Sequence, residues 1–429
     1  MTDAASVEAF LLTREQFGMR FGLQRMRRLL TEVGDPQSAI PAVHVVGTNG
    51  KSSTTLMIAA ALRAQRLKTG GFTSPHLLSF RERIDIGGAM IDEAAFVAAA
   101  GPVVAAIERF DSGAAADDRV TQFEAIAAIA FVAFIAAGLD AIVVEAGLGG
   151  RLDATNVLGD SRVQVLTGVG IDHTQYLGET IEEIAAEKVA VVRSGAVMVA
   201  GELGQAAHIV ANRMTDERNA QLIELREEAS VFDALPGAFV RRNASLALAA
   251  AEVAYGRIAD GIGDFDRAAA TAAVVGFAHD SRLLGRLQIA NLEPLEVRDS
   301  AHNEQAAEAL VDAVREIAGD RPVTLLVAML ADKHIDETLA RLLEAVAADG
   351  VVVCTQTSNP RAVPAGELAQ RAAENAAPGV RVETEPAPLA ALDRARAVAG
   401  QGGLLAVAGS NYLLADLLRD PSAPAGATL

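Results

Sequence analysis

Residues 44–55, HVVGTNGKSSTT, combine the residue types that a phosphate-binding turn needs. A short apolar strand runs into Gly47, and Gly50 and Lys51 then lead into a run of hydroxyl side chains. Backbone N–H groups that converge at glycines, a lysine and the start of a helix all favour a phosphate ligand. The spacing between Gly47 and Gly50 is shorter than a full Walker A loop requires, so the strict pattern fails. A simple helix cap is the alternative, because serine often caps helices.

Polar side chains close three further apolar runs. Ser74 ends GGFTS, Glu145 ends AIVVE, and Asp172 and His173 follow VQVLTGVG. The carboxyl ends of strands in an open parallel sheet share one edge, so we expect these side chains near Lys51. Singly, they could be a turn, a helix-dipole partner and a loop histidine. Together they predict a cation site, since a carboxylate and a serine hydroxyl suit Mg²⁺ and a histidine ligand leaves room for Mn²⁺.

Short β-rich runs alternate with Ala- and Leu-rich helical stretches, which predicts parallel α/β sheets. A helix is expected near residues 51–66. The first series of expected strands is VHVVG, GGFTS, DAIVVEAG and VQVLTGVG. The second series is EPLEVRDSAHN, VTLLVAML, GVVVCTQ, VRVETE and GLLAVAGS. The rhythm changes near residues 280–288, so we expect two α/β domains, followed by a disordered polar tail at 420–429.

Composition limits the class of protein. The 429 residues are 51% apolar and 21% charged, and a net charge of -18 argues against an extended nucleic-acid surface. The most apolar run, residues 125–138, is too short to cross a bilayer, and the first residues lack a signal-peptide pattern. The single cysteine, Cys354, allows no internal disulfide, and its strand-like setting predicts a core residue. We expect a cytoplasmic monomer that binds neither membrane nor nucleic acid.

Seven segments match one known family in order along the chain: GTNGKSS at 47–53, TSPHLLSFRERI at 73–84, EAGLGGRLDATNV at 145–157, IDHTQYLG at 171–178, AEKVAV at 186–191, GRLQI at 285–289 and DSAHN at 299–303. The chain thereby resembles the folate branch of the Mur ligases, folylpolyglutamate synthase and the bifunctional dihydrofolate synthase/folylpolyglutamate synthase. The resemblance implies an α/β fold with a mostly parallel, P-loop-like ATPase domain at residues 1–283 and a smaller Rossmann-like domain at residues 284–419. The implied activity is ATP-dependent ligation of L-glutamate to dihydropteroate or a reduced folate through an acyl phosphate.

The resemblance also implies which residues bind ATP and metal. The ATP phosphates would contact Gly47, Thr48, Asn49, Gly50, Lys51, Ser52 and Ser53. Adenine, phosphate and ribose would contact Asn243, Arg286 and Asp299, the last two in the second domain. The ligands of two Mg²⁺ ions, or of Mn²⁺, would be Ser53 or Ser52, Ser74, a bridging Glu145 and His173. Lys188 matches a family lysine that is often carbamylated, although Val189 and Ala190 add bulk beside it. Catalytic roles would fall to Lys51, Lys188, His173 and Arg286.

Three segments match those that line the family's pterin pocket. They contribute Gly22, Leu23, Gln24, Arg25, Thr121, Gln122, Phe123, Glu124, Leu152, Asp153 and Ala154. His302 and Asn303 follow the DSAHN aspartate and are expected to face the cleft, His302 towards substrate.

Two other functions stay open at the level of sequence. A related ligase could use another acid, such as a cell-wall precursor or a poly-glutamate chain, and a paralogue could bind nucleotide or folate without catalysis. The intact GLGGRLDATN and SPHL segments favour the folate ligase over the first. The joint presence of Lys51, Glu145, His173 and Lys188 argues against the second. The sequence leaves open the choice between dihydropteroate and reduced folates, and the number of glutamates added.

Overall fold

The computed structural model describes residues 2–14, 20–113, 118–226, 229–258, 263–278, 284–331 and 335–419. Contacts within the chain separate it into two compact units. Unit 1 consists of Met1–Phe232 and Arg242–Ala278, and unit 2 of Asp233–Arg241 and His279–Leu429. The division that the sequence analysis put at residue 283 lies outside the described residues, as does the tail at 420–429.

Unit 1 contains, within the described residues, an eight-stranded sheet whose core is parallel. An antiparallel hairpin forms one edge. In spatial order the strands are β4 (Ala89–Met90), β3 (Ile84–Ile86), β2 (Thr69–Phe72), β5 (Ala141–Glu145), β1 (Ala42–Val46), β6 (Ser161–Leu166), β7 (Val197–Ala200) and β8 (Gln221–Glu224). Every residue of β1, β2, β5 and β7 is buried, as continuous apolar strands covered on both faces require. The predicted parallel α/β sheet is confirmed.

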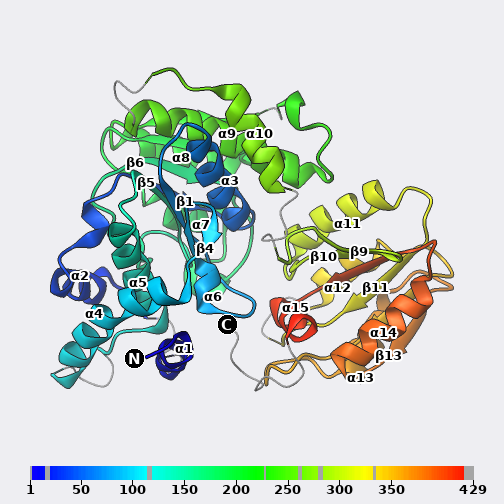
Figure 1. Cartoon of the computed structure of the whole chain (residues 1–429). Coiled ribbons are helices and arrows are strands. Elements are labelled where there is room, and N and C mark those ends of the chain that lie inside the picture. Colours follow the sequence, from blue (N-terminus) through cyan, green and yellow to red (C-terminus); the bar gives the residue numbers. More distant parts are fainter. Residues whose placement is uncertain are drawn as a thin grey trace. The chain divides into compact units, whose positions relative to one another are not determined.

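Helices cover both faces of this sheet (Figure 1). On one face, α1 (Ala4–Thr13), α2 (Leu23–Glu32), α4 (Glu93–Ser112) and α5 (Gln122–Ala136) enclose one hydrophobic core. The same face continues under α7 (Ile181–Val189) and α8 (Gln205–Asp216). The other face packs against α3 (Lys51–Ala64), which α10 (Arg267–Ala278) covers in turn. The described residues also form the short α6 (Thr174–Leu177) and the long α9 (Ala238–Ile258), which belongs to unit 1 from Arg242 onwards.

Capping side chains fix where several helices of unit 1 begin. Thr121 and Glu124 form a capping box at the start of α5, and Thr180 and Glu183 form another at the start of α7. The predicted helix at 51–66 is confirmed as α3. No helix in the described part of the chain is long and apolar enough to cross a membrane, and this includes α5 with its apolar run.

The strand order of unit 1 reverses at β1. From β1 the chain passes to β2 and β5 on one side and then returns to β6 on the other. The connections on the two sides diverge at such a point and leave a crevice at the carboxyl ends of the strands. The turn after β1, the end of β5 and the loop after β6 therefore all open onto the edge where an α/β sheet holds its ligands.

Unit 2 contains a six-stranded sheet within the described residues, parallel except for the edge strand β9. Its spatial order is β13 (Arg381–Thr384), β12 (Val351–Cys354), β11 (Val323–Val327), β14 (Leu404–Ala408), β10 (Leu295–Arg298) and β9 (Gln288–Leu292). One face packs on α11 (Glu304–Ala318), α12 (Ile335–Leu343) and α13 (Ala365–Asn375), and the other on α14 (Pro388–Ala399) and α15 (Asn411–Leu418). Cys354 is fully buried on β12, and burial raises the pKa of its thiol to about 12. The prediction of a core cysteine is confirmed.

Candidate functional site

The turn between β1 and α3 depends on two glycines. Gly47 and Gly50 have φ angles of 152° and 81°, in the range that side chains rarely adopt. A Cβ at Gly47 would overlap the hydroxyl of Thr167, and a Cβ at Gly50 would lie 2.5 Å from Oδ1 of Asn243. The backbone of the turn therefore lies directly against Thr167 and Asn243, and Asn243 meets the predicted phosphate turn from α9.

Hydrogen bonds to the loop after β6 hold this turn in place. The N–H of Thr48 donates to the carbonyl of Gly168 at 3.0 Å, and its hydroxyl both accepts from the N–H of Gly170 at 2.9 Å and lies 3.2 Å from that residue's carbonyl. The hydroxyl of Thr167 donates to the carbonyl of Asn49 at 2.6 Å. These bonds cross from β1 to β6 and keep the turn in one conformation before any ligand arrives.

Two lysine amines converge on one carbonyl of the turn. Nζ of Lys188, in the last turn of α7, donates to the carbonyl of Gly47 at 2.8 Å. Nζ of Lys51 donates to the same carbonyl at 3.1 Å and to that of Thr48 at 3.2 Å. Burial lowers the pKa of Lys188 to about 7, and the nearby charge of Lys51 adds to the effect. Two amines this close to one backbone carbonyl suit an anion at the turn.

The ends of β2 and β5 meet beside the first turn of α3. The hydroxyl of Ser52 donates to the carbonyl of Ser74 at 3.3 Å, and the N–H of Ser74 donates to Oε2 of Glu145 at 3.1 Å. Glu145 is 1% exposed, and the neighbouring Ser53 is also buried. The structure thus brings Ser52, Ser74 and Glu145 together at one edge of the sheet.

The buried guanidinium of Arg83 interacts electrostatically with the carboxylate of Glu145. Burial lowers the pKa of Arg83 to about 10, and the charges of Glu145 and Glu82 oppose that shift. Nε of Arg83 donates to Nδ1 of His76 at 2.8 Å. Glu145 therefore has a protein cation near it even before a metal ion binds.

His173 lies in the loop that follows β6. It precedes α6 with a positive φ of 51°, and its N–H donates to Oδ1 of Asp172 at 2.9 Å. Its Nε2 lies 3.9 Å from Oδ2 of the same carboxylate. His173 thus lies beside Asp172 in this loop, and its role as a metal ligand stays a prediction.

The oxygen atoms of Glu145, Ser52 and Ser53 suit a hard cation whose other ligands are oxygen atoms of phosphate and water. Among the described residues, no group of three or more His, Cys, Asp and Glu side chains forms a metal cluster. Glu145 and the hydroxyls of Ser52 and Ser53 supply few protein ligands, and Mg²⁺ commonly binds through one or two carboxylates together with phosphate oxygens and water. The residues fit a metal that arrives with a nucleotide.

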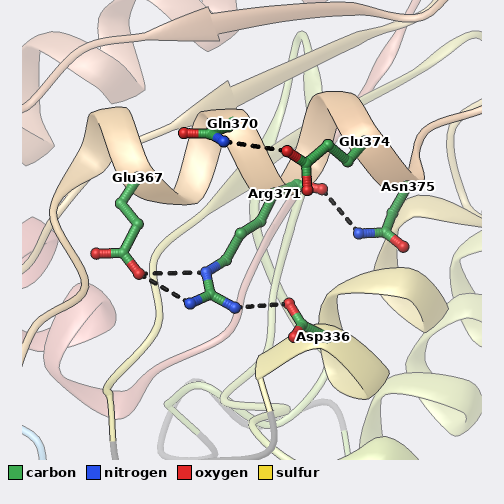
Figure 2. Close-up of a pocket in the computed structure, with 6 residues that line it drawn as sticks. All are labelled: Asp336, Glu367, Gln370, Arg371, Glu374 and Asn375. Carbon is green, nitrogen blue, oxygen red and sulfur yellow. Dashed lines mark hydrogen bonds and ion pairs between the residues drawn. The ribbon is translucent and has the colours of Figure 1, made fainter.

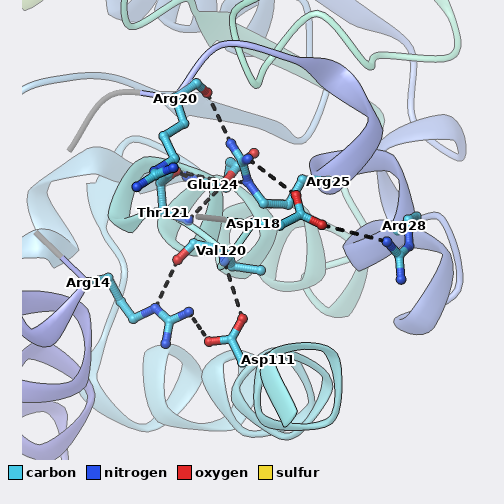
Figure 3. Close-up of polar contacts among 9 residues, drawn as sticks. All are labelled: Arg14, Arg20, Arg25, Arg28, Asp111, Asp118, Val120, Thr121 and Glu124. Carbon is cyan, nitrogen blue, oxygen red and sulfur yellow. Dashed lines mark hydrogen bonds and ion pairs between the residues drawn. The ribbon is translucent and has the colours of Figure 1, made fainter. Parts of the chain in front are cut away.

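The segments predicted to bind the acid substrate meet in a buried ion pair. Nε of Arg25 donates to Oε2 of Glu124 at 2.7 Å, and the N–H and hydroxyl of Thr121 donate to the same oxygen at 2.9 and 2.8 Å. Figure 3 shows how this group joins a second arginine, Arg14, whose Nε donates to the carbonyl of Val120 at 2.9 Å. The start of α5 is thus held from both α1 and α2.

The other members of these segments lie nearby on the same elements. Gly22 precedes α2 with a φ of 136°, Leu23 packs on the core and Gln24 is exposed. Nε2 of Gln122 donates to the carbonyl of Leu11 at 3.2 Å. A Cβ at Gly147 would lie 2.6 Å from the ring of Phe123, so this ring packs against the loop that follows β5.

The loop after β5 contains Leu152, Asp153 and Ala154, and Asp153 organises it. Oδ2 of Asp153 accepts from the N–H of Leu148 at 2.8 Å, and Oδ1 accepts from the N–H and hydroxyl of Thr155 at 2.9 and 2.6 Å. Burial raises the pKa of Asp153, and these hydrogen bonds oppose the rise. Leu152 is partly exposed and Ala154 is buried beside it.

The predicted residues of unit 2 lie on two adjoining turns. Asp299 accepts from the N–H of Leu287 at 2.7 Å and from that of Ala301 at 2.8 Å. Burial raises the pKa of Asp299, and the charge of Arg286 opposes the rise. Nδ1 of His302 lies 2.8 Å from the carbonyl of Ser300.

Asn303 has a clear structural task. Its side chain accepts from the N–H of Ala306 and caps α11. This part of the predicted site belongs to unit 2.

A polar pocket of about 500 Å³ also lies in unit 2, and none of the predicted residues lines it. Its lining residues are Asp336, Glu367, Gln370, Arg371, Glu374 and Asn375. Figure 2 shows that Arg371 is bound to Glu367 and to Asp336, both at 2.9 Å. Since the guanidinium is already paired and the other lining residues are acids and amides, we assign no substrate to this pocket.

Sequence reasoning missed two residues that shape the site. Thr167 directly follows Leu166, the last residue of β6, so the criterion of a polar residue at a strand end would have found it. Arg83 lies inside the matched segment 73–84, and a charge next to an apolar strand was the available signal. Both act on the turn and on the carboxylate that the sequence did identify.

Comparison with known proteins identifies the family. Residues 45–196 match the Mur ligase middle domain, and residues 285–411 match the glutamate ligase domain of Mur ligases. A dihydrofolate synthase/folylpolyglutamate synthase of Mycobacterium tuberculosis is 34% identical over 84% of this chain and 79% of its own length. A probable bifunctional folylpolyglutamate synthase/dihydropteroate synthase of Haloferax volcanii is 31% identical over 95% of this chain, which spans about half of that relative, 49%.

Solved structures agree with this assignment. A Mycobacterium tuberculosis folylpolyglutamate synthase complexed with ADP superimposes with a TM-score of 0.85 at 31% identity, covering 98% of this chain and 99% of that one. A bifunctional folylpolyglutamate synthase/dihydrofolate synthase of Yersinia pestis, complexed with AMPPNP and Mn ion, gives a TM-score of 0.80 at 28% identity and covers 97% and 98%. The two-domain α/β fold is that of these enzymes, and the chain belongs to the folylpolyglutamate synthase/dihydrofolate synthase branch of the Mur ligase family.

Proposed function

We propose that this chain is an ATP-dependent ligase that joins the amine of L-glutamate to the carboxylate of dihydropteroate or of a reduced folate, with release of ADP and phosphate. The observation that carries the proposal is the convergence of Lys51 and Lys188 on the Gly47 carbonyl, in a glycine turn at the switch point of the sheet. Family membership adds the class of substrate. The related structures hold ADP or AMPPNP, which supports ATP as the phosphoryl donor here.

The reaction begins with activation of the acid. A carboxylate is a poor electrophile, so its oxygen attacks the γ-phosphorus of ATP, the bond to the β-phosphate oxygen breaks, and ADP leaves an acyl phosphate behind. Negative charge develops on the transferred group during this step, and Lys51 at the turn is placed to neutralise it. The glutamate amine then attacks the acyl carbon, phosphate leaves, and the nitrogen loses a proton.

Glu145 is the carboxylate that we assign to the metal ion. With Ser74, His173 and the hydroxyl of Ser53 or Ser52 it would hold one or two Mg²⁺ ions, or Mn²⁺ as in the Yersinia pestis complex. A bound cation supplies charge neutralisation for the phosphoryl group. The contact between Ser74 and Glu145 fixes the direction of the carboxylate before the cation binds.

Lys188 is a candidate for reaction with carbon dioxide. Its pKa of about 7 leaves a large fraction of the amine neutral near neutral pH, and only a neutral amine adds to CO₂ to form a carbamate with loss of a proton. The added carboxylate would turn a buried cation into an anion able to support a second metal ion. Val189 and Ala190 flank this position, so the space around the amine decides whether the product fits.

We assign the remaining predicted residues to binding of the acid substrate and of the nucleotide. One group of polar side chains is fixed by hydrogen bonds to Glu124 and consists of Arg25, Thr121 and Glu124 itself. The ring of Phe123 packs against the loop after β5, which also contains Asp153. We infer that the pterin ring binds along these segments. The three residues assigned to adenine, phosphate and ribose are Asn243, Arg286 and Asp299, and His302 follows them along the chain.

We also propose a cytoplasmic monomer. Support comes from the acidic composition and from the single buried Cys354. Size-exclusion chromatography with light scattering measures the oligomeric state directly.

ADP release tests the proposed function. The purified protein is given ATP, Mg²⁺ and L-glutamate with dihydropteroate, with tetrahydrofolate, or with no acid, and the conjugate is identified by mass spectrometry. We expect ADP release that requires both the acid and glutamate. Release that ignores the folate acid but responds to a cell-wall precursor or a poly-glutamate chain points to another ligase of the family, and no release under any condition points to a non-catalytic paralogue.

A further inference from the structure

His44 is a buried polar residue at the centre of the unit 1 sheet, and the proposed reaction does not use it. It lies in the middle of β1, is 1% exposed, and pairs in register with Val144 of β5 and Gln164 of β6. Three residues further along the chain, just after β1 ends, is Gly47, where the phosphate turn begins. A histidine in a fully covered parallel strand costs stability unless a partner satisfies it.

The partner of His44 belongs to the loop after β5. Nε2 of His44 lies 2.8 Å from the hydroxyl oxygen of Thr155, which lies 2.6 Å from Oδ1 of Asp153. The backbone N–H of Thr155 also donates to Oδ1, and the N–H of Leu148 donates to Oδ2. An unbroken series of hydrogen bonds therefore runs from β1 to both oxygens of the Asp153 carboxylate.

The direction of these bonds follows from counting protons. The hydroxyl of Thr155 carries one hydrogen, and the carboxylate of Asp153 accepts from this hydroxyl and from the N–H groups of Thr155 and Leu148. The hydroxyl therefore donates to Asp153 and must accept from His44, which requires the tautomer with hydrogen on Nε2. Burial lowers the pKa of His44 to about 3, with the charge of Arg193 adding to the effect, so the ring stays neutral at working pH. A ring held neutral exchanges no proton with substrate.

We propose that His44 is a positioning residue for the acid substrate, acting through the Thr155 hydroxyl to fix the carboxylate of Asp153. The inference rests on the proposed function, in which the loop containing Asp153 lines the pterin site. Asp153 would present an oriented carboxyl acceptor that suits the N–H donors of a pterin ring. The loop and the phosphate turn would then share one strand as their common support.

Other contacts of the loop show why the bond to β1 matters. Nη2 of Arg193 donates to Oδ1 of Asn156 at 2.9 Å, and the N–H of Arg151 donates to the carbonyl of Glu187 at 2.9 Å. Both contacts join the loop to α7 or to the segment just after it. The bond from His44 joins it to the sheet, so its loss would leave the Asp153 side of the loop held by the loop's own backbone.

Two substitutions at His44 distinguish the effect of losing the hydrogen-bond donor from the effect of changing the side-chain volume. His44→Gln keeps an N–H near the position of Nε2, whereas His44→Leu fills the space without a donor. We expect His44→Leu to raise the KM for dihydropteroate or tetrahydrofolate about tenfold, with the KM for ATP changed less than about twofold, and His44→Gln to stay within about threefold of wild type for both. Thr155→Val should reproduce the effect of His44→Leu and serves if the latter does not fold.

Gln164→Leu is the matched control, because Gln164 is an equally buried polar residue on the adjacent strand and its amide donates to Ser161, outside the loop. It should lower thermal stability without changing the KM for the acid. Equal KM increases in Gln164→Leu and His44→Leu would show that His44 is only structural. A limb lost from the pH–rate profile in His44→Gln would show instead that it transfers a proton.

Binding measured without glutamate keeps this test separate from the proposed function. Calorimetric titration of dihydropteroate into wild type, His44→Leu and Gln164→Leu involves no turnover. Weaker binding in His44→Leu alone supports the inference even if wild type proves to lack ligase activity. Equal dissociation constants in all three proteins, or no binding to wild type, would overturn it.

Discussion

Replacing Lys188 with methionine tests whether the amine behind the phosphate turn is neutral in the folded protein. Methionine keeps most of the length and apolar stem of the side chain and removes the charge. Lys188 is 3% exposed, and its Nζ donates to the carbonyl of Gly47 at 2.8 Å. Burial lowers its pKa from an ordinary 10.5 to about 7. Because Lys188→Met removes a buried charge, it should make the empty protein more stable at low pH. Because it also removes the amine, it should abolish ligation.

The size and sign of the stability change follow from proton linkage. Between pH 7 and 10.5 the unfolded lysine is protonated and the folded one is not, so wild-type stability rises with pH across this window. Below pH 7 both states carry the proton, and the full cost of the buried charge, on the order of 5 kcal/mol, opposes folding. Methionine pays none of this cost. Its advantage should be largest at pH 6 and smaller by about 3 kcal/mol at pH 9.

Urea unfolding at several pH values measures this difference. Circular dichroism follows the transition in buffers freed of carbon dioxide, and the curves are fitted with one transition per unit because two-domain proteins need not unfold together. Subtracting the wild-type free energy of unfolding from that of Lys188→Met cancels the titration of all other groups. The slope with pH is the test, since the constant offset also contains packing and the lost bond to Gly47.

Lys68→Met is the control for the loss of one lysine, because Lys68 is exposed. Parallel curves for wild type and Lys188→Met from pH 6 to 9 would refute the reasoning, since they would mean that Lys188 keeps its proton when folded. A slope of opposite sign would mean that folding raises the pKa of this amine.

Four further outcomes follow from the site. Lys51→Ala should lower kcat about a hundredfold or more while the circular dichroism spectrum and melting temperature stay near wild type, and wild-type turnover in this variant would exclude the phosphate assignment. Glu145→Gln should abolish ligation even at high Mg²⁺, whereas raised Mg²⁺ should partly rescue His173→Ala, and both should melt near wild type if their roles are functional. Removal of divalent metal with EDTA should stop ADP release, and added Mg²⁺ or Mn²⁺ should restore it; release that continues in EDTA contradicts the metal site. Arg286→Ala should raise the KM for ATP and slow acyl-phosphate formation, with Arg286→Lys recovering part of the loss because lysine lacks the guanidinium fork; unchanged ATP kinetics in Arg286→Ala would rule its role out.

The strands and the polar residues at their ends could be predicted because a short, continuous stretch of sequence determines each of them. VHVVG and AIVVE are continuous apolar runs that close on a glycine turn and a carboxylate, and they form β1 and β5. A strand buried on both faces leaves this pattern wherever it lies in the sheet. For the same reason α3 was found within two residues of its end at Ala64.

Contacts between distant segments could not be predicted in this way. Nothing near Lys188 in sequence indicates that its amine reaches Gly47, or that His44 meets Thr155 across the sheet. The position of β2 beyond β5, and the grouping of residues 233–241 with unit 2, likewise depend on pairings far along the chain. Motif resemblance supplied candidate roles for such residues, and the structure supplies their partners.

The strand order of unit 1 also constrains how the protein assembles during synthesis. β1 and β2 are consecutive along the chain, yet β5 lies between them, and β1 pairs only with β5 and β6. Pairs such as Val45 with Glu145 join residues far apart in sequence, and such pairs form late and leave strand edges open until the partner arrives. A nascent chain that ends before β5 therefore holds β1 without a neighbour. The Glu145 carboxylate reaches its place when β5 pairs with β1, and the turn after β1 gains its hydrogen bonds only when the loop after β6 follows, so a ribosome-bound fragment lacking β5 has neither in place.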